Sequence, residues 1–244
     1  PKQKIMVDIM AFGAHPDDVE LGCGGTIAKE INNGSSVVIV DLTQGELGSR
    51  GSAELRKKEA ESAAQVLGVI HRFNLALPDG FFQNEPANQL KVIQYLRKFR
   101  PRWVLCNAKD DRHIDHPKGS SLVSDACFLS GLVKIETIDP ESGEAQAPWR
   151  PQAVYHYIQW KNSAPDFVVD ISGFLDKKME AISCYPSQFY DPNNPGPDTP
   201  ISSKNFFDSV RYRAQDLGRL VGSDAAEGFT VERLLAVNYL SDLQ

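Results

Sequence analysis

A polar turn that follows an apolar run near the start of the chain constrains this sequence more than any other feature. The apolar run, residues 5–10, predicts a buried strand that continues to Gly13, and the glycines beyond the turn open a predicted helix. Between them stands the sequence Ala-His-Pro-Asp-Asp, which contributes His15, Asp17 and Asp18. In an open α/β sheet, ligands bind at the carboxyl ends of the strands, which is where these three side chains fall.

The residue types in this turn are those of a metal site. His15 and Asp18 are three residues apart, so a tight turn can aim both at one point. An imidazole nitrogen with a carboxylate oxygen suits Zn²⁺ and other divalent first-row metals. Asp17 lies between them and is free to act on what the metal holds. The alternative is an Asp-rich helix cap with an incidental histidine.

A second turn of the same design follows another apolar run, residues 103–106. It contains His113, Asp115 and His116 just beyond a predicted strand. If the two strands are parallel neighbours, both turns open at one edge of the sheet. Three protein ligands with one open position are typical of a catalytic zinc site rather than a structural one.

Strand and helix patterns alternate through residue 132 and predict a Rossmann-like, doubly wound, mostly parallel sheet flanked by helices. The length of 244 residues fits one domain, 1–244, in which residues 1–132 form the core and residues 133–244 complete the sheet and the pocket. Periodicity does not decide whether residues 228–237 form a strand or a helix. Because the first strand is not followed by Gly-x-Gly-x-x-Gly, a non-enzymatic nucleotide-binding module is the weaker alternative.

Charge and cysteine content exclude several classes of partner. The formal net charge of −6 argues against broad binding to nucleic acid. The four cysteines form no C-x-x-C pair, which fits a reducing cytoplasm. We find no apolar run long enough for a membrane span and no signal-peptide pattern at the start, so we expect a cytoplasmic protein that binds no membrane.

Three segments together resemble the LmbE/PIG-L family of zinc-dependent N-acetylglucosamine deacetylases: the Ala-His-Pro-Asp-Asp turn, Thr-Gln-Gly-Glu at residues 43–46, and His-Ile-Asp-His at residues 113–116. Within the family, the chain looks most like the deacetylase of bacillithiol biosynthesis, which acts on N-acetylglucosaminyl-malate. The resemblance implies a small-molecule N-acetyl amino sugar conjugate as substrate and a homo-oligomeric assembly. A deacetylase or amidase that acts on another N-acyl sugar or small amide is the alternative.

The resemblance also assigns the central roles. His15, Asp18 and His116 would hold the metal, and Asp17 would act as the general base. Zn²⁺ is the expected ion, although a ligand set of two histidines and one aspartate also accepts Fe²⁺, Co²⁺ or Mn²⁺. His113 would donate to the oxyanion as an imidazolium.

For the remaining residues, a functional and a structural interpretation both stay open. Asp115 would orient His113 and favour its charged form, or it would cap the following helix. His113 itself could be a solvated loop histidine, Glu46 could face solvent, and Arg56 could form a surface ion pair on its helix. The expected substrate contacts are Glu46, Arg56, Arg50, Arg112 and Gln188.

Overall fold

The computed structural model describes residues 6–194 and 196–243 and confirms the predicted fold class. A single sheet contains every strand in this part of the chain. The strands are β1 (Ile9–Gly13), β2 (Val37–Thr43), β3 (His71–Leu77), β4 (Trp103–Cys106), β5 (Ala153–Tyr157), β6 (Phe167–Asp170) and β7 (Ala226–Val231). Their order is β3-β2-β1-β4-β5-β7-β6, in which the first five are parallel and β7 runs antiparallel to both of its neighbours.

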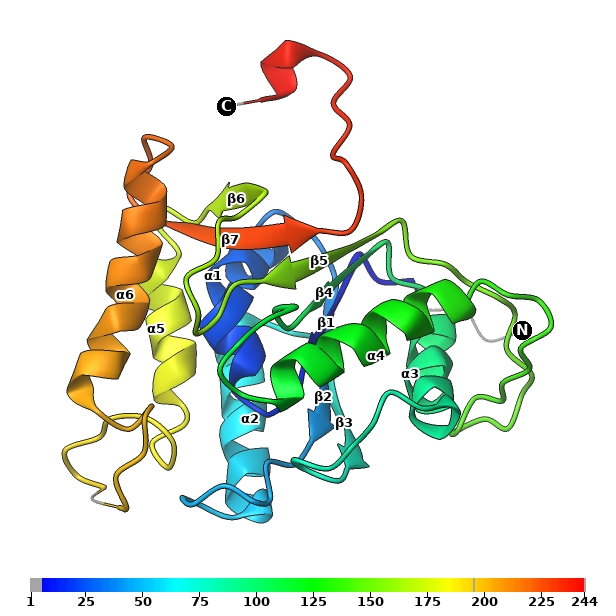
Figure 1. Cartoon of the computed structure of the whole chain (residues 1–244), viewed down its shortest axis with the longest axis horizontal. Helices are drawn as coiled ribbons and strands as arrows, with labels where there is room; N and C mark the ends of the chain where they lie inside the picture. Colours follow the sequence, from blue (N-terminus) through cyan, green and yellow to red (C-terminus); the bar gives the residue numbers. More distant parts are fainter. Residues whose placement is uncertain (1–5, 195, 244) are drawn as a thin grey trace.

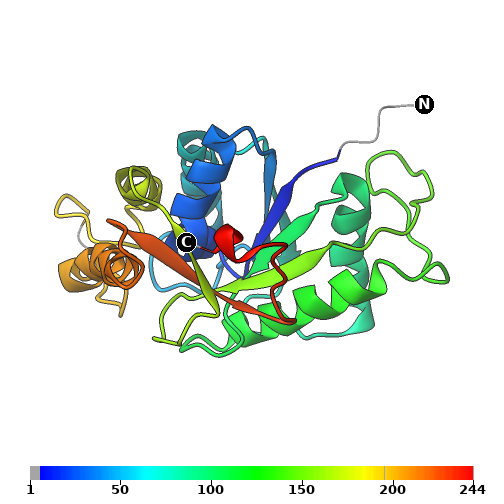
Figure 2. The same ribbon diagram turned by 90° about the horizontal axis from the view of Figure 1, so that it is seen from above.

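Helices cover both faces of the sheet (Figures 1 and 2). Helices α3 and α4 pack on one face, α1 and α2 on the other, and α5 and α6 lie outside α1 and β7. The helices are α1 (Asp18–Asn32), α2 (Ala53–Leu67), α3 (Pro86–Phe99), α4 (Asp115–Leu129), α5 (Leu175–Ser183) and α6 (Lys204–Arg219). None of the helices described has the length and apolar character required to cross a membrane.

Strand β1 shows why the sheet is buried on both faces. Met10 and Phe12 pack in the core that includes α3 and α4, whereas Ile9 and Ala11 pack in the core that includes α1. Successive side chains of a strand point to opposite faces, so an apolar run without alternation needs a cover on each side. The apolar run that predicts this strand therefore also explains why helices cover both faces of the sheet.

Two helices begin earlier than the sequence pattern predicts. Helix α1 begins at Asp18 rather than at residue 22, because the Asp17 carbonyl already accepts the N–H of Leu21. Helix α4 begins at Asp115 rather than at residue 120. Asp18 and His116 therefore lie in the first turns of helices, which hold them more rigidly than loops would.

The last predicted element is a strand, β7, which ends at Val231. Strands β5, β6 and β7 all come from residues beyond 133. The first strand is shorter than predicted, because β1 starts at Ile9 and not at the beginning of the apolar run. Ile5, where the predicted strand begins, lies outside the described residues.

Candidate metal centre and active site

Two neighbouring strand ends bring the metal-binding candidates together. Strands β1 and β4 pair in parallel at the point where the strand order reverses, which is the usual ligand site of such sheets. His15 Nδ1 lies 3.5 Å from Asp18 Oδ2, and His116 Nε2 lies 3.2 Å from Asp18 Oδ1. All three side chains are buried. Their role as metal ligands stays a prediction, but their geometry can be tested against that role.

Two of the donor separations are close to those around a small cation. A tetrahedral zinc ion with bonds of 2.0–2.1 Å separates its donor atoms by about 3.3 Å. The two separations, 3.5 and 3.2 Å, lie on either side of this value, although they run to the two different oxygens of the Asp18 carboxylate. Two imidazoles with one carboxylate also match the donor types that zinc and its first-row neighbours bind. The residues present therefore fit a divalent metal.

The second nitrogen of each histidine faces a carboxylate. His116 Nδ1 lies 2.6 Å from Asp111 Oδ2, and His15 Nε2 lies 3.0 Å from Asp79 Oδ1. Burial lowers the pKa of His116, but Asp18 and Asp111 outweigh it and raise that pKa to about 9. Carboxylates in this position fix the ring orientation and the tautomer of metal-ligating histidines. The arrangement leaves His15 Nδ1 and His116 Nε2 pointing to Asp18.

Sequence reasoning missed these supporting residues. Asp79 follows β3 and Asn107 follows β4, so both lie at the same edge of the sheet as the two histidine turns. Asn107 and Gln159 donate to the Asp18 carboxylate through their side-chain amides. Asp111 stands in the second turn itself. A search for polar residues directly after each predicted strand would have found Asp79 and Asn107.

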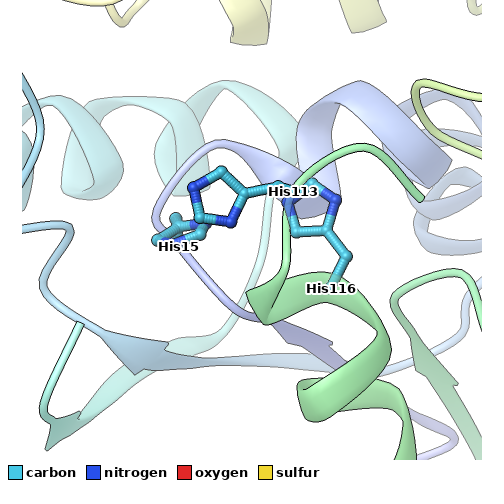
Figure 3. Close-up of side chains that lie close together, drawn as sticks. All are labelled: His15, His113 and His116. Carbon is cyan, nitrogen blue, oxygen red and sulfur yellow. The ribbon is translucent and has the colours of Figure 1, made fainter. Parts of the chain in front are cut away.

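His113 lies beside the proposed ligands (Figure 3). Its ring centroid is 4.5 Å from that of His15 and 5.2 Å from that of His116. Nitrogen atoms of these three rings all lie within 4.8 Å of one another, and donor atoms of His15, Asp79 and Asp115 do so as well, so each trio is a possible ligand set that differs from the predicted one. Burial, together with positive charge on His15 and His116, lowers the pKa of His113. These two influences disfavour the imidazolium that we expected at this position.

Asp115 contacts His113 through its backbone N–H, which donates to His113 Nδ1 at 3.3 Å, and not through its carboxylate as expected. Its carboxylate lies 3.4 Å from His15 Nε2, accepts the Gly80 N–H at 2.7 Å and pairs with Lys118 at 3.2 Å. The physical reason is that α4 begins at Asp115, so its side chain turns back toward the loop after β3. The Asp115 carboxylate therefore lies beside His15, and its backbone N–H holds the predicted histidine, His113.

Asp17 occupies a strained and buried position. Its φ of 116° is unusual for a residue with a side chain, and such strain concentrates at functional sites. Burial raises the pKa of Asp17 to about 7, although Arg56 opposes the shift through an ion pair of 2.8 Å. Arg56 is buried, which excludes the alternative of a surface ion pair. Gly45 packs so closely on the Arg56 guanidinium that a Cβ there would lie 1.9 Å from Nη1.

Three other predicted substrate contacts hold the loops in place. The Glu46 side chain is not part of the cavity wall; it accepts the N–H of Asp79 at 2.9 Å. Arg50 donates to three backbone carbonyls, including that of Ser187 at 2.7 Å. Gln188 donates to the Arg50 carbonyl at 2.8 Å. Arg50 and Gln188 do line the cavity, whereas the predicted substrate contact of Glu46 is not supported by its position.

A cavity of about 530 Å³ opens over this cluster. Its far wall includes Trp160, whose ring stacks on Phe206 of α6 and lies 4.5 Å from the Arg112 guanidinium. Arg213 of α6 also lines the cavity and donates to the Trp160 carbonyl. Burial lowers the pKa of Arg213. Neither Arg112 nor Arg213 forms an ion pair with another described residue. Sequence reasoning missed Arg213, which no local pattern distinguishes from other charges on its helix.

A doubly wound sheet with buried histidines and carboxylates at its switch point defines an α/β protein with a candidate divalent-metal centre. Residues 10–127 match the model of the PIG-L family, described as GlcNAc-PI de-N-acetylase. The diacetylchitobiose deacetylase of Thermococcus kodakarensis is 30% identical over 193 residues, covering 74% of this chain and 70% of that protein. The chain belongs to the PIG-L family.

Solved structures extend the similarity across the chain. A conserved protein of Thermus thermophilus shares 37% identity with a TM-score of 0.82, over 96% of this chain and 99% of that chain. The N,N'-diacetylchitobiose deacetylase of Pyrococcus horikoshii has 25% identity and a TM-score of 0.77, over 97% and 88%. The 4-oxalmesaconate hydratase of Pseudomonas putida is 24% identical, over 73% of each chain, so relatives do not all share one reaction. The reaction that this chain catalyses must therefore be inferred from the residues of its own site.

Proposed function

We propose that this protein is a metal-dependent deacetylase that hydrolyses the acetamide of an N-acetylglucosamine conjugate. The observation that carries the proposal is the buried group of His15, Asp18 and His116, in which a nitrogen of each histidine lies within 3.5 Å of the Asp18 carboxylate, with Asp17 adjacent. The names of similar proteins support it, since two kinds of N-acetylglucosamine deacetylase are among them. A divalent metal bound there would polarise the amide carbonyl and lower the pKa of a coordinated water.

The proposed roles of the chain's own residues follow from their positions. Asp17 takes a proton from the attacking water, and its raised pKa, about 7, suits a general base that works near neutral pH. Arg56 holds the Asp17 carboxylate at 2.8 Å, so the base keeps one orientation. Asp17 then passes the same proton to the amine that leaves as the C–N bond breaks. Acetate and a free amino sugar are the products.

His113 is the proposed hydrogen-bond donor to the carbonyl oxygen. It is half-buried, lines the cavity and lies beside both metal-ligating histidines. A neutral imidazole donates one N–H to the oxygen as negative charge develops there, which is the usual way to stabilise such a transition state. Asp115 acts through His15, whose ring it helps to hold.

The finer proposal is that the conjugate is acidic, as in N-acetylglucosaminyl-malate of bacillithiol biosynthesis. Arg112 and Arg213 flank Trp160 in the wall of the cavity, and guanidinium groups suit planar carboxylates. The cavity of about 530 Å³ lies in the size range of sites for small conjugates. We further propose Zn²⁺ as the metal, a homo-oligomeric assembly and a cytoplasmic location, in keeping with four free thiols.

Acetate release tests the reaction. The zinc-loaded protein should release acetate from N-acetylglucosaminyl-malate, and Asp17→Asn should retain the metal but lose at least a hundredfold in kcat. Asp110→Asn is the matched control, because Asp110 pairs with Lys161 at the surface. His116→Ala should lower the metal content. Protein that carries metal but releases no acetate from this conjugate, diacetylchitobiose or an N-acetylglucosaminyl-inositol would overturn the proposal.

The acidic substrate needs a separate test. Arg213→Met should raise KM for N-acetylglucosaminyl-malate about tenfold or more and leave KM for diacetylchitobiose unchanged. Arg211→Met is the control, because Arg211 lies on the same helix and pairs with Asp176 at the surface. Equal effects on both substrates would contradict an acid-binding role while leaving the deacetylase proposal intact.

A further inference from the structure

An ionisable side chain, His156 of β5, is buried between the sheet and α4. It is 1% exposed and lies on the same face of its strand as Val154, which packs against the apolar core that includes α3 and α4. Both ring nitrogens face oxygen atoms that can only accept a hydrogen bond. Nδ1 lies 3.0 Å from the Asn107 carbonyl, and Nε2 lies 2.8 Å from the Glu232 carboxylate. Each nitrogen carries a proton when it makes its bond, so the geometry describes an imidazolium.

The ion pair of His156 with Glu232 needs a reason to stand at the border of an apolar core. The hydrogen bond from His156 lowers the pKa of the Glu232 carboxyl, so the pair is ionised near neutral pH. Taking charges out of water is costly, and apolar side chains of similar volume often stabilise a fold equally well. The contacts of the pair therefore point to a purpose other than packing.

One set of these contacts reaches α4, which carries His116 in its first turn. His116, Ser120 and Ser124 follow one another at intervals of four residues, so they lie on one face of the helix. The Ser120 hydroxyl lies 2.8 Å from His156 Nδ1, and the Ser124 hydroxyl donates to Glu232 at 2.6 Å. The ion pair thus holds the face of α4 that carries His116.

The other set of contacts reaches the turn after β1 through Asn107, which is completely buried. The Asn107 carbonyl accepts the His156 N–H, while its side-chain amide accepts the Ala14 N–H at 2.8 Å and donates to Asp18 Oδ2 at 3.0 Å. Ala14 directly precedes His15 in the chain. The position of Asn107 therefore affects both the Asp18 carboxylate and the backbone that carries His15.

We propose that His156 and Glu232 form a clasp that positions the three proposed metal ligands relative to one another. The clasp reaches one ligand through α4 and the other two through Asn107. His156 acts through Asn107 and Ser120, so it is a positioning residue and not a catalytic one. Ligands held in place by surrounding hydrogen bonds bind a metal more tightly, so loss of the clasp should weaken metal binding. This inference rests on the proposed metal centre and on no step of the reaction.

Cobalt substitution tests the clasp, because the visible absorption spectrum of bound Co²⁺ reports the arrangement of its ligands. The full chain is loaded with Co²⁺, and its affinity is measured by competition with a chelator of known affinity. We expect His156→Gln and Glu232→Gln each to bind Co²⁺ about tenfold more weakly, with an altered spectrum. The double variant should bind no more weakly than His156→Gln alone, because the two side chains act as one pair.

Asp8→Asn is the control for a loss of stability without a loss of positioning. Asp8 accepts the Ser36 N–H and hydroxyl, both at 2.8 Å, at the opposite end of β1 from the proposed metal centre. This variant should lower the midpoint of urea unfolding but leave the cobalt spectrum and affinity unchanged. Circular dichroism would verify that each variant is folded. Should His156→Gln not fold, Glu232→Gln, at a side chain that is 35% exposed, decides the test.

The outcomes separate the clasp from the metal centre on which it rests. Wild-type spectrum and affinity in the folded variants would overturn the clasp and leave the metal centre standing. Losses that Asp8→Asn reproduces, or that add up in the double variant, would also overturn the clasp. A wild-type protein that binds no Co²⁺ would overturn the proposed metal centre, and the clasp with it.

Discussion

The carboxylates behind the two proposed metal-ligating histidines should contribute unequally to metal affinity. Asp111 is the carboxylate on His116 Nδ1, at 2.6 Å, and the described residues place no second carboxylate on that nitrogen. His15 Nε2 has two, with Asp79 at 3.0 Å and Asp115 at 3.4 Å. Loss of Asp111 therefore leaves His116 without its acceptor, whereas loss of Asp79 leaves His15 with a substitute.

Substitution of such a supporting carboxylate costs about 10- to 100-fold in metal affinity. We expect Asp111→Asn to fall near the upper end, a loss of about 2.7 kcal/mol, and Asp79→Asn near the lower end, about 1.4 kcal/mol. The asparagine amide keeps the volume of the side chain but removes its charge. Asp111 also accepts the Lys161 N–H at 2.9 Å, which adds to the cost of changing it.

The assay is competition for Zn²⁺ between each variant and a chelator of known affinity at fixed pH and ionic strength. Asp110→Asn is the control, because Asp110 precedes Asp111 in the chain but its carboxylate pairs with Lys161 at the surface. Asp110→Asn should bind zinc as the wild type does. An unchanged affinity for Asp111→Asn, or a larger loss for Asp79→Asn than for Asp111→Asn, would show that these carboxylates do not support the ligands as argued.

Two further predictions concern the loop that contains Gly45 and the stability of the fold. Gly45→Ala should lower kcat on the order of a hundredfold, because its Cβ would displace the Arg56 guanidinium; Gly143→Ala has a similar positive φ but open space and should leave kcat unchanged. Burial lowers the pKa of His156, but Cys106 and Glu232 outweigh it and raise that pKa to about 10. The folded state thus favours the protonated form of His156. The contribution of this protonation to the free energy of unfolding is fully present below pH 6.5 and is lost as pH rises toward 10. In urea unfolding, the stability advantage of wild type over His156→Gln should shrink by up to about 1.4 kcal/mol per pH unit across that window; a constant difference would mean that His156 is neutral in the fold.

The sequence predicts the position of the site better than its internal contacts. A polar turn after an apolar run indicates which residues reach the carboxyl edge of the sheet, and β1 and β4 do bring His15 and His116 side by side. Which atoms meet within 3 Å depends on how separate loops pack against each other. Asp115 turns toward Gly80 because of the loop after β3, and no spacing within the His-Ile-Asp-His segment encodes that loop.

Charge states are the hardest property to predict from the sequence. Asp115 next to His113 in the chain favours an imidazolium, but the folded protein surrounds His113 with two other imidazoles and removes water from it. The Asp115 carboxylate, meanwhile, faces His15. A pKa reports the sum of burial and all nearby charges, so adjacent residues alone give the wrong sign here.

The first helix shows why the distant C-terminal part is needed for the site. Helix α1 is broken at Cys23, whose φ of −144° is not helical, and the break leaves backbone N–H groups without their helical acceptors. The Glu227 carboxylate, about 200 residues away in the chain, accepts the N–H groups of Gly25 and Thr26 at 3.0 and 2.6 Å. Lys178 pairs with Glu227 beside them.

A buried ion pair is costly to desolvate and is retained where polar groups need partners. At the break in α1, Lys178 also donates to the Leu21 carbonyl at 2.7 Å, so both kinds of orphaned backbone group are satisfied. Asp18 lies in the short segment of α1 before the break. The orientation of its side chain therefore follows from the turn after β1 and not from the axis of the helix beyond Cys23. The strained backbone of Asp17 and the broken helix beyond it thus constrain the two carboxylates from both sides, so the Asp17 side chain meets Arg56 while that of the adjacent Asp18 meets His116.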